Sequence, residues 1–432
     1  MSMRETIRET RSICPVCGRN LPAILTRDGD GAVYLDRSCP VHGSYSVPVW
    51  RGKLDFAAWT RGAGPLGGRG EGCPENCGLC GEHESDSCCV LLEVTKRCSL
   101  RCRFCFARGG EGEDIPAEEL KAAIREIAEG CGGPLLQLSG GEPTLRDDLP
   151  ELAAYAREAG CSFVQVNTNG LRLAREPEYA KRLAEAGTDI IFLQFDGTRE
   201  EIYRTLRGAP LLEEKLEAVR VCAELGMGVT LVPTVVPGVN VDNLGDLVRL
   251  AASLAPGVRG VHFQPVSYFG RYPLRPEGED RYTLDQLMAD LCAQLGVQPS
   301  SFMPSRCDHP LCGFHARYLI GPEGELQALS DISHTPRTRG TAKENREFVA
   351  RQWRKAAPAP QSAAFGEVMD FDAFLAAVRQ RSLTLSAMAF QDALNLNLER
   401  LHRCSLHVYD KGRIKPFCAE YLSLTGEGEA EE

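Results

Sequence analysis

Cys98, Cys102 and Cys105 form a C-x3-C-x2-C loop in which an aromatic residue, Phe104, precedes the last cysteine. Three thiolates at this spacing can bind three irons of a 4Fe–4S cluster, whereas a cluster that only stores electrons usually has four protein thiolates. The fourth iron is then open to a substrate or cofactor. The loop therefore predicts a cluster that acts on a bound molecule.

A second cysteine triplet repeats this spacing, although random placement of the 19 cysteines would produce such a triplet only about 0.04 times. An apolar run at 90–95 reads as a buried strand that leads into the Cys98 loop, whereas a Gly-rich linker precedes the other triplet. We therefore assign the open cluster to the Cys98 loop and a closed auxiliary cluster to the other triplet. The predicted ligands of that closed cluster are Cys73, Cys77, Cys80 and either Cys88 or Cys89.

Two short knuckles near the N-terminus share one form, a pair of metal-binding residues with glycine directly after the second. The pairs are Cys14 with Cys17 and Cys39 with His42. Together they predict a tetrahedral site for zinc, or for a single iron as in rubredoxin. The sequence does not distinguish the two metals. Two unrelated turns with free thiols are the less favoured alternative.

The C-terminal third carries cysteines from three separate places, which could hold a second closed 4Fe–4S cluster. These are Cys307, Cys312, Cys404 and Cys418. Four other cysteines stand alone in predicted core elements and are expected to be small buried apolar residues, namely Cys131, Cys161, Cys222 and Cys292. His83 and His309 lie near predicted ligands and could support them, or could be ordinary turn histidines.

Composition sets broad limits on function. The chain has 432 residues, a net charge of −10 and no long basic tract, which argues against nucleic acid as the main partner. Its apolar runs are too short for a transmembrane segment, and the N-terminus has no secretory signal, so we expect a cytoplasmic protein. The odd number of cysteines excludes complete intrachain pairing, and their tight clusters favour metal binding over disulfides.

Alternating strands and helices predict a parallel α/β sheet between residues 90 and 300. Pro116 marks the start of the first helix, expected at 117–129. Six such units would make a partial barrel, with ligand sites at the C-terminal ends of the strands. The predicted strands are 90–95, 134–138, 162–167, 188–195, 228–234 and 260–264.

Polar motifs follow several of these strands. Gly140 and Gly141 allow backbone amides to approach a ligand, and Glu142 can bind an ammonium group. Each motif alone could be ordinary turn chemistry, but their common edge predicts one site. The candidate residues are Ser139, Gly140, Gly141, Glu142, Asn167, Asn169, Gln194, Asp196, Thr234 and Gln264.

The order of these motifs resembles the multicluster radical S-adenosylmethionine (SAM) proteins. That family includes archaeal tetraether lipid synthases, hydroxymethylpterin methyltransferases and bacterial relatives, some of them selenoproteins. The shared features are the N-terminal knuckles, both cysteine triplets, the Gly-Gly-Glu turn, Cys307 to Cys312, Phe390-Gln-Asp392 and Pro416-Phe-Cys418. The chain departs from the family pattern after Cys418, where relatives tend to have Ala-Tyr-Asn.

The resemblance implies a partial (β/α)6 radical SAM barrel between a rubredoxin-like domain and a C-terminal auxiliary-cluster region. The corresponding division is 1–65, a bridging auxiliary-cluster segment at 66–92, 93–300 and 301–432. A charged stretch at about 335–360 is expected to be a surface loop or mobile insertion, and the acidic tail 426–432 to be disordered.

The resemblance also implies a mechanism. The open cluster, Cys98, Cys102 and Cys105, would bind SAM, with Phe104 and the strand-end motifs around it. One electron from a ferredoxin- or flavodoxin-type reductant would yield a 5′-deoxyadenosyl radical for C–C bond formation or methylation of a lipid- or pterin-like substrate. Two auxiliary 4Fe–4S clusters and one N-terminal Fe or Zn would accompany it. Alternatives are a peptide-modifying radical SAM maturase, an electron-transfer iron–sulfur protein and a zinc-only scaffold.

Overall fold

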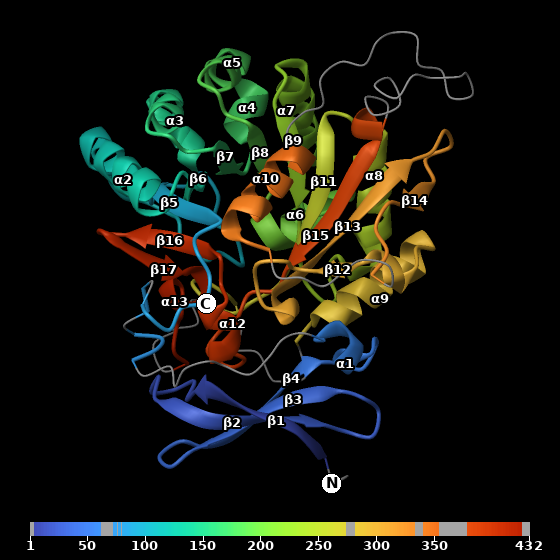
Figure 1. The fold of residues 1–432 in the computed structure, drawn as a ribbon. Coiled ribbons are helices and arrows are strands. Elements are labelled where there is room, and N and C mark those ends of the chain that lie inside the picture. The colour runs from blue at the N-terminus through green and yellow to red at the C-terminus, as the bar shows by residue number, and fades with distance from the viewer. Residues whose placement is uncertain are drawn as a thin grey trace.

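The computed structural model describes residues 4–61, 72–75, 77–78, 80–273, 281–332, 340–353 and 378–425. A small N-terminal sheet lies below a large mixed sheet in Figure 1. The small sheet is an antiparallel meander in which alternate side chains are buried, as expected for a sheet with one face on the core. Its elements are β1 (Glu5–Ile13), β2 (Asn20–Arg27), β3 (Val33–Cys39), β4 (Gly43–Trp50) and the short helix α1 (Phe56–Trp59).

The six predicted strands of the βα repeat are present and lie parallel in chain order. Val90 and Val94 on the first strand are fully buried, and each such side chain contributes about 1.5–3 kcal/mol to folding. This confirms the predicted partial α/β barrel. The strands are β5 (Cys89–Thr95), β6 (Leu135–Gly140), β7 (Phe163–Thr168), β8 (Ile190–Gln194), β9 (Gly228–Val232) and β11 (Val258–Pro265).

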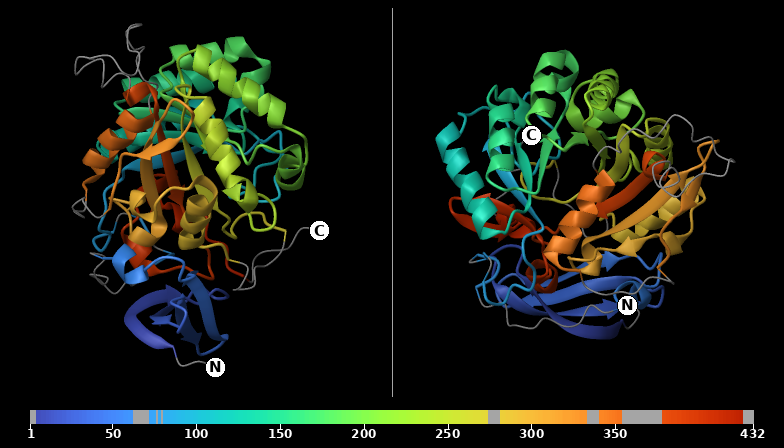
Figure 2. Two further views of the ribbon diagram at one scale, coloured as in Figure 1. Left: turned by 90° about the vertical axis from the view of Figure 1, so that its right-hand side faces the viewer. Right: turned by 45° about the horizontal axis from the view of Figure 1, so that its top comes forward.

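Helices cover the outer side of these strands, as Figure 2 shows. The first begins directly after Pro116, and Glu118 and Glu119 in its first turn complement the helix dipole. The helices of this repeat are α2 (Ala117–Gly130), α3 (Leu149–Glu158), α4 (Leu171–Arg175), α5 (Pro177–Glu185), α6 (Glu200–Arg207), α7 (Leu212–Glu224) and α8 (Leu244–Ser253).

Strands from the C-terminal third extend both edges of the same sheet. β16 (Leu406–Asp410) pairs parallel to β5, and β15 (Ser382–Met388) pairs parallel to β11. Eight neighbouring strands therefore run parallel, from β16 through β5 to β15. Shorter or antiparallel additions are β10 (Thr234–Val235), β12 (Met303–Pro304), β13 (Gly313–Ile320), β14 (Leu326–Ala328) and β17 (Arg413–Pro416), with helices α9 (Leu284–Leu295), α12 (Leu398–His402) and α13 (Phe417–Glu420).

The prediction of a surface loop at 335–360 is wrong for its middle part, which forms α10 (Ala342–Trp353). Val349, Ala350 and Trp353 pack against residues at the N-terminal ends of β5 to β8. The helix was missed because this short apolar stripe is embedded in a mostly charged sequence. Residues 335–339, 354–360 and the tail 426–432 lie outside the described residues. No described helix is both long enough and apolar enough to span a bilayer.

Candidate active site and metal centres

The Cys98 loop leaves the C-terminal end of β5 and is fixed by backbone hydrogen bonds on three sides. The amide of Cys98 donates to Gly110 at 2.8 Å, and the amide of Arg103 donates to Leu206 at 3.0 Å. Cys105 and Arg271 exchange two backbone hydrogen bonds, at 3.0 and 2.9 Å. The loop is thus held in place by chain segments far from it in sequence.

The three thiols of this loop are only partly buried. Burial raises the pKa of Cys98 to about 12, and the charges of Glu142, Cys102 and Cys105 act in the same direction. Without a bound cation, the Cys98 thiol is therefore protonated at neutral pH. A bound metal deprotonates coordinating thiols, so this donor set fits an iron–sulfur cluster.

The glycine pair after β6 lies directly against the start of the cysteine loop. Gly140 has φ +124°, and a Cβ atom there would be 2.2 Å from the carbonyl oxygen of Thr95. A Cβ on Gly141 would lie 2.2 Å from the carbonyl oxygen of Arg97. The amide of Glu142 donates to this same Arg97 oxygen at 2.7 Å. Only glycine permits this close approach of the two loops.

The carboxylate of Glu142 joins two of the predicted motifs. It is 2% exposed. Oε1 accepts hydrogen bonds from the amide and hydroxyl of Thr144 at 3.1 and 2.6 Å, and from the hydroxyl of Thr168 at 2.6 Å. Oε2 accepts from the amide of Asn169 at 2.7 Å. Because Oε2 receives one of these bonds and a carboxylate oxygen has two lone pairs, Oε2 can accept another donor.

Asn169 also ties this loop to the cysteine loop, since its Nδ2 donates to the hydroxyl of Ser99 at 3.2 Å. Ser139 is buried on β6, in register with Glu93 of β5. Phe104 packs edge-on against Tyr268, with ring centroids 6.4 Å apart. Asn169 thus joins two loops of the predicted site, whereas Ser139 and Phe104 contact neighbouring elements.

Two buried cations that sequence reasoning missed lie beside the strand-end motifs. Nζ of Lys215 donates to the carbonyl of Asn169 at 2.5 Å and to Oε1 of Gln194 at 2.7 Å. Burial lowers the pKa of Lys215 to about 8, although the charge of Asp196 opposes this. The signal was present in the sequence, because Lys215 occupies the apolar stripe of α7. The second cation, Arg207 at the end of α6, forms an ion pair with Asp196 at 2.6 Å.

Asn167 and Gln264 face a different place, an interior cavity of about 160 Å³. Their neighbours include the amides of Gln137 and Gln165, and Nε2 of Gln165 donates to Asn167 at 2.6 Å. No arginine or lysine lies among the described residues that line it. The aromatic lining residues are Phe106, Phe192, Trp353, Phe390 and Phe417.

His262 contributes a neutral imidazole to this cavity. Burial lowers its pKa to about 4, and Nδ1 lies 2.9 Å from the hydroxyl of Ser386. Trp353 of α10 packs beside it, with its ring stacked on Phe192 at a centroid distance of 5.4 Å. Helix α10 therefore closes the cavity at the N-terminal ends of the strands.

The N-terminal knuckles come together as predicted. The side-chain donor atoms of Cys14, Cys17, Cys39 and His42 all lie within 4.8 Å of one another. Nδ1 of His42 is 3.4 Å from Sγ of Cys14 and 3.6 Å from Sγ of Cys39. Three sulfurs and one imidazole nitrogen suit a closed tetrahedral metal site.

We expect Cys39→Ser to remove one equivalent of zinc or mononuclear iron per chain without changing the content of acid-labile sulfide. The reason is that a tetrahedral site loses most of its affinity when one thiolate is lost. Metal analysis with sulfide determination checks this, and Cys161→Ala, at a buried cysteine outside every predicted site, is the control. Loss of sulfide in Cys39→Ser would show that the knuckles hold a cluster instead.

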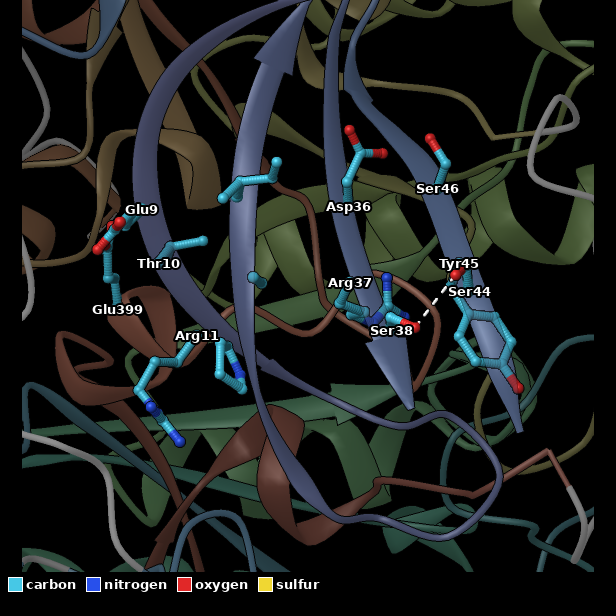
Figure 3. Close-up of a pocket in the computed structure, with 13 residues that line it drawn as sticks. Glu9, Thr10, Arg11, Asp36, Arg37, Ser38, Ser44, Tyr45, Ser46 and Glu399 are labelled. Carbon is cyan, nitrogen blue, oxygen red and sulfur yellow. Dashed lines mark hydrogen bonds between the residues drawn. The ribbon is translucent and has the colours of Figure 1, made fainter. Parts of the chain in front are cut away.

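A separate open cavity of about 800 Å³ lies over the face of the small sheet. Figure 3 shows Asp36, Tyr45 and Glu399 among its lining residues, with a hydrogen bond between Ser38 and Ser44. None of the predicted site residues lines it.

The triplet Cys73, Cys77 and Cys80 contacts the C-terminal region next to Cys404. Sγ of Cys73 lies 3.4 Å from Nε2 of His402. The side chain of Cys73 raises the pKa of Cys77 most. Burial and the charges of Cys80 and Cys404 raise it further. Cys88 and Cys89 line the interior cavity, where Nδ2 of Asn345 donates to Sγ of Cys88 at 3.0 Å.

The C-terminal cysteines are only partly brought together. Cys312, Cys404 and Cys418 line one small cavity with Asp308. Cys307 is absent from its lining, and the Cys307 thiol donates to the carbonyls of Gly340 and Thr341 at 3.7 and 3.6 Å.

Comparison with known proteins gives two family matches. Residues 92–251 match the Radical SAM superfamily, and residues 6–51 match the HMPTM N-terminal zinc ribbon domain. The 7,8-dihydro-6-hydroxymethylpterin dimethyltransferase of Methanocaldococcus jannaschii is 30% identical over an alignment of 472 positions, which covers 95% of this chain and 92% of that protein.

Other similarities cover less of the chain. The Fe-coproporphyrin III synthase of Methanosarcina barkeri is 41% identical over 147 residues, which are 33% of this chain and 35% of that protein. The crystal structure of Streptococcus suis SuiB bound to precursor peptide SuiA is 16% identical, with a TM-score of 0.42 over 50% of this chain and 48% of SuiB.

Proposed function

Because the chain belongs to the multicluster radical SAM family, we propose that Cys98, Cys102 and Cys105 hold the 4Fe–4S cluster at which SAM is bound and reductively cleaved. A radical SAM domain implies both this cluster and SAM, and an external one-electron reductant. When bound, the cluster and SAM supply a 5′-deoxyadenosyl radical that abstracts hydrogen from carbon. A ferredoxin or flavodoxin would supply the electron.

Glu142 is the residue that we propose binds the ammonium group of SAM. Its Oε2 atom has a remaining acceptor position, and four hydrogen bonds fix the carboxylate before any ligand arrives. Gly140 and Gly141 hold it against the cysteine loop. A preorganised anion placed in this way costs little reorganisation on binding. Ser139, Asn169, Gln194, Thr234 and Phe104 would complete the surroundings of SAM.

We propose two auxiliary clusters, with one change from the sequence prediction. Cys404 would be the fourth ligand beside Cys73, Cys77 and Cys80, because His402, two residues before it, contacts Cys73 at 3.4 Å, whereas Cys88 and Cys89 face the interior cavity. The second cluster would include Cys312 and Cys418, with Asp308 or Cys307 among its remaining ligands.

The proposed reaction is C-methylation or C–C bond formation on a pterin-like heteroaromatic substrate. The observation that supports a pterin over a lipid is the interior cavity, where uncharged amides face aromatic rings. Gln137, Gln165 and Asn167 hydrogen-bond with one another. Ring amides can use the donor and acceptor positions that these bonds leave, whereas a hydrocarbon chain would leave those positions unused. The dimethyltransferase relative is named for a substrate of this class.

Two other functions fit the residues less well. A peptide maturase would need room for an extended chain, but the interior cavity holds only about 160 Å³. A protein that only transfers electrons would need neither the glycine pair nor an amide-lined cavity. Equilibrium dialysis with SAM separates this last function from an enzyme.

The test is to incubate anaerobically reconstituted protein with SAM and dithionite, and to measure 5′-deoxyadenosine. Formation of 5′-deoxyadenosine is expected, and its absence from fully reconstituted protein would overturn the proposal. Equilibrium dialysis with 6-hydroxymethylpterin tests the substrate class. We expect Gln165→Ala to weaken retention about tenfold, the effect of one lost buried hydrogen bond. Retention of isoprenoid lipid but not of the pterin would favour the lipid substrate.

A further inference from the structure

Arg207 is a buried cation at the edge of the proposed cluster site, and the proposed function gives it no role. It is 6% exposed and ends α6. Its Nε and Nη2 atoms donate to the two oxygens of Asp196 at 2.7 and 2.6 Å, and Nη2 also donates to the hydroxyl of Thr234 at 3.0 Å. A guanidinium with three such bonds has a fixed position.

The backbone brings Cys102 to this guanidinium. The amide of Arg103, next to Cys102, donates to the carbonyl of Leu206, next to Arg207, at 3.0 Å. Although burial opposes it, the charges of Asp196 and Cys102 raise the pKa of Arg207. One backbone contact therefore joins the cysteine loop to the end of α6, and the charges of Cys102 and Arg207 interact across it.

Asp196 has no acceptor position left for a ligand. Its carboxylate receives two bonds from Arg207, one from the amide of Thr234 at 3.1 Å and one from the side-chain amide of Gln194. These four bonds use the lone pairs of both oxygens. Asp196 therefore acts through Arg207.

We propose that Arg207, positioned by Asp196, raises the reduction potential of the open cluster by placing a buried positive charge next to the loop that carries Cys102. This inference rests on the proposed function for the identity of the cluster. Reduction adds one negative charge to the cluster, and a buried cation nearby stabilises the reduced form more than the oxidised form. Arg207 is a positioning residue in this proposal, because it acts on the cluster through its charge.

The test is an EPR-monitored redox titration of reconstituted full-length protein without SAM. The open cluster is identified as the signal that changes when SAM is added. We expect Arg207→Gln to lower the ratio of reduced to oxidised open cluster about tenfold at a fixed applied potential, equivalent to 59 mV for a one-electron couple. Arg207→Lys keeps the charge and should lower the ratio less. Arg204→Gln, at an exposed arginine on the same helix, should leave it unchanged.

An unchanged potential in Arg207→Gln would overturn the inference. If that variant does not assemble the cluster, Arg207→Lys and Thr234→Val decide the matter, because each alters the guanidinium or its support. Wild-type potentials in both would show that Arg207 only stabilises the fold. Absence of any SAM-responsive signal in the wild-type protein would instead contradict the proposed function.

Discussion

Replacing Cys98 with alanine is expected to reduce formation of 5′-deoxyadenosine more than a thousandfold, to the background of the assay. Two remaining thiolates cannot retain a cubane that needs three protein ligands. Without the cluster no electron reaches the sulfonium, so the loss lies in the chemical step. Quantification of 5′-deoxyadenosine after reconstitution checks this.

The matched control is Cys292→Ala, a cysteine on α9 outside every proposed metal site. This variant should produce 5′-deoxyadenosine at the wild-type rate. Iron content separates the possible reasons for a loss, because Cys98→Ala should lack about four irons while keeping those of the auxiliary and N-terminal sites. Undiminished product from Cys98→Ala would place SAM cleavage at another cluster.

Glu142→Ala is expected to weaken SAM binding at least a hundredfold and to destabilise the fold by about 3 kcal/mol. The substitution removes the acceptor of four hydrogen bonds from Thr144, Thr168 and Asn169 in a buried place. It also removes the anion that we propose for the ammonium group of SAM. Equilibrium dialysis with SAM and denaturant unfolding measure the two effects.

Glu142→Gln separates these effects, because it keeps the shape and one carbonyl acceptor but not the charge. We expect a smaller loss of stability than for alanine, with SAM binding still reduced at least tenfold. Glu158→Ala, at an exposed glutamate at the end of α3, is the control. Wild-type SAM affinity in Glu142→Gln would show that Glu142 only joins the loops.

Local sequence patterns were sufficient to predict the parallel strands at the core of the fold. Apolar runs broken by glycine and proline predicted β5 to β9 and β11, because strands buried on both faces need continuous apolar sequence. The same reasoning missed β15, β16 and α10. Their positions depend on pairing with β11 and β5, and on a short apolar stripe that fills the end of the barrel.

The residues of the candidate site likewise include some that the sequence predicted and others that it missed. Spacing alone grouped the four ligands of the N-terminal knuckles, since nearby ligands in a tight turn must lie together. Spacing could not choose between Cys88 and Cys89, which follow Cys73, Cys77 and Cys80 closely in the chain. It also could not point to Cys404, whose neighbour His402 meets Cys73 only in the folded chain. Arg207 and Lys215 were missed because a charged residue on a helix is expected to face solvent.

The sequence by itself determined the chemistry, because three thiolates at fixed spacing and a Gly-Gly-Glu turn after the next strand are properties of the local chain. Only the tertiary structure decided which side chains meet those groups. The groups that hold the Arg207 guanidinium, the donors that fix Glu142 and the amides of the interior cavity come from segments far apart in the chain. Their meeting depends on sheet register and helix packing, which a short stretch of sequence does not specify.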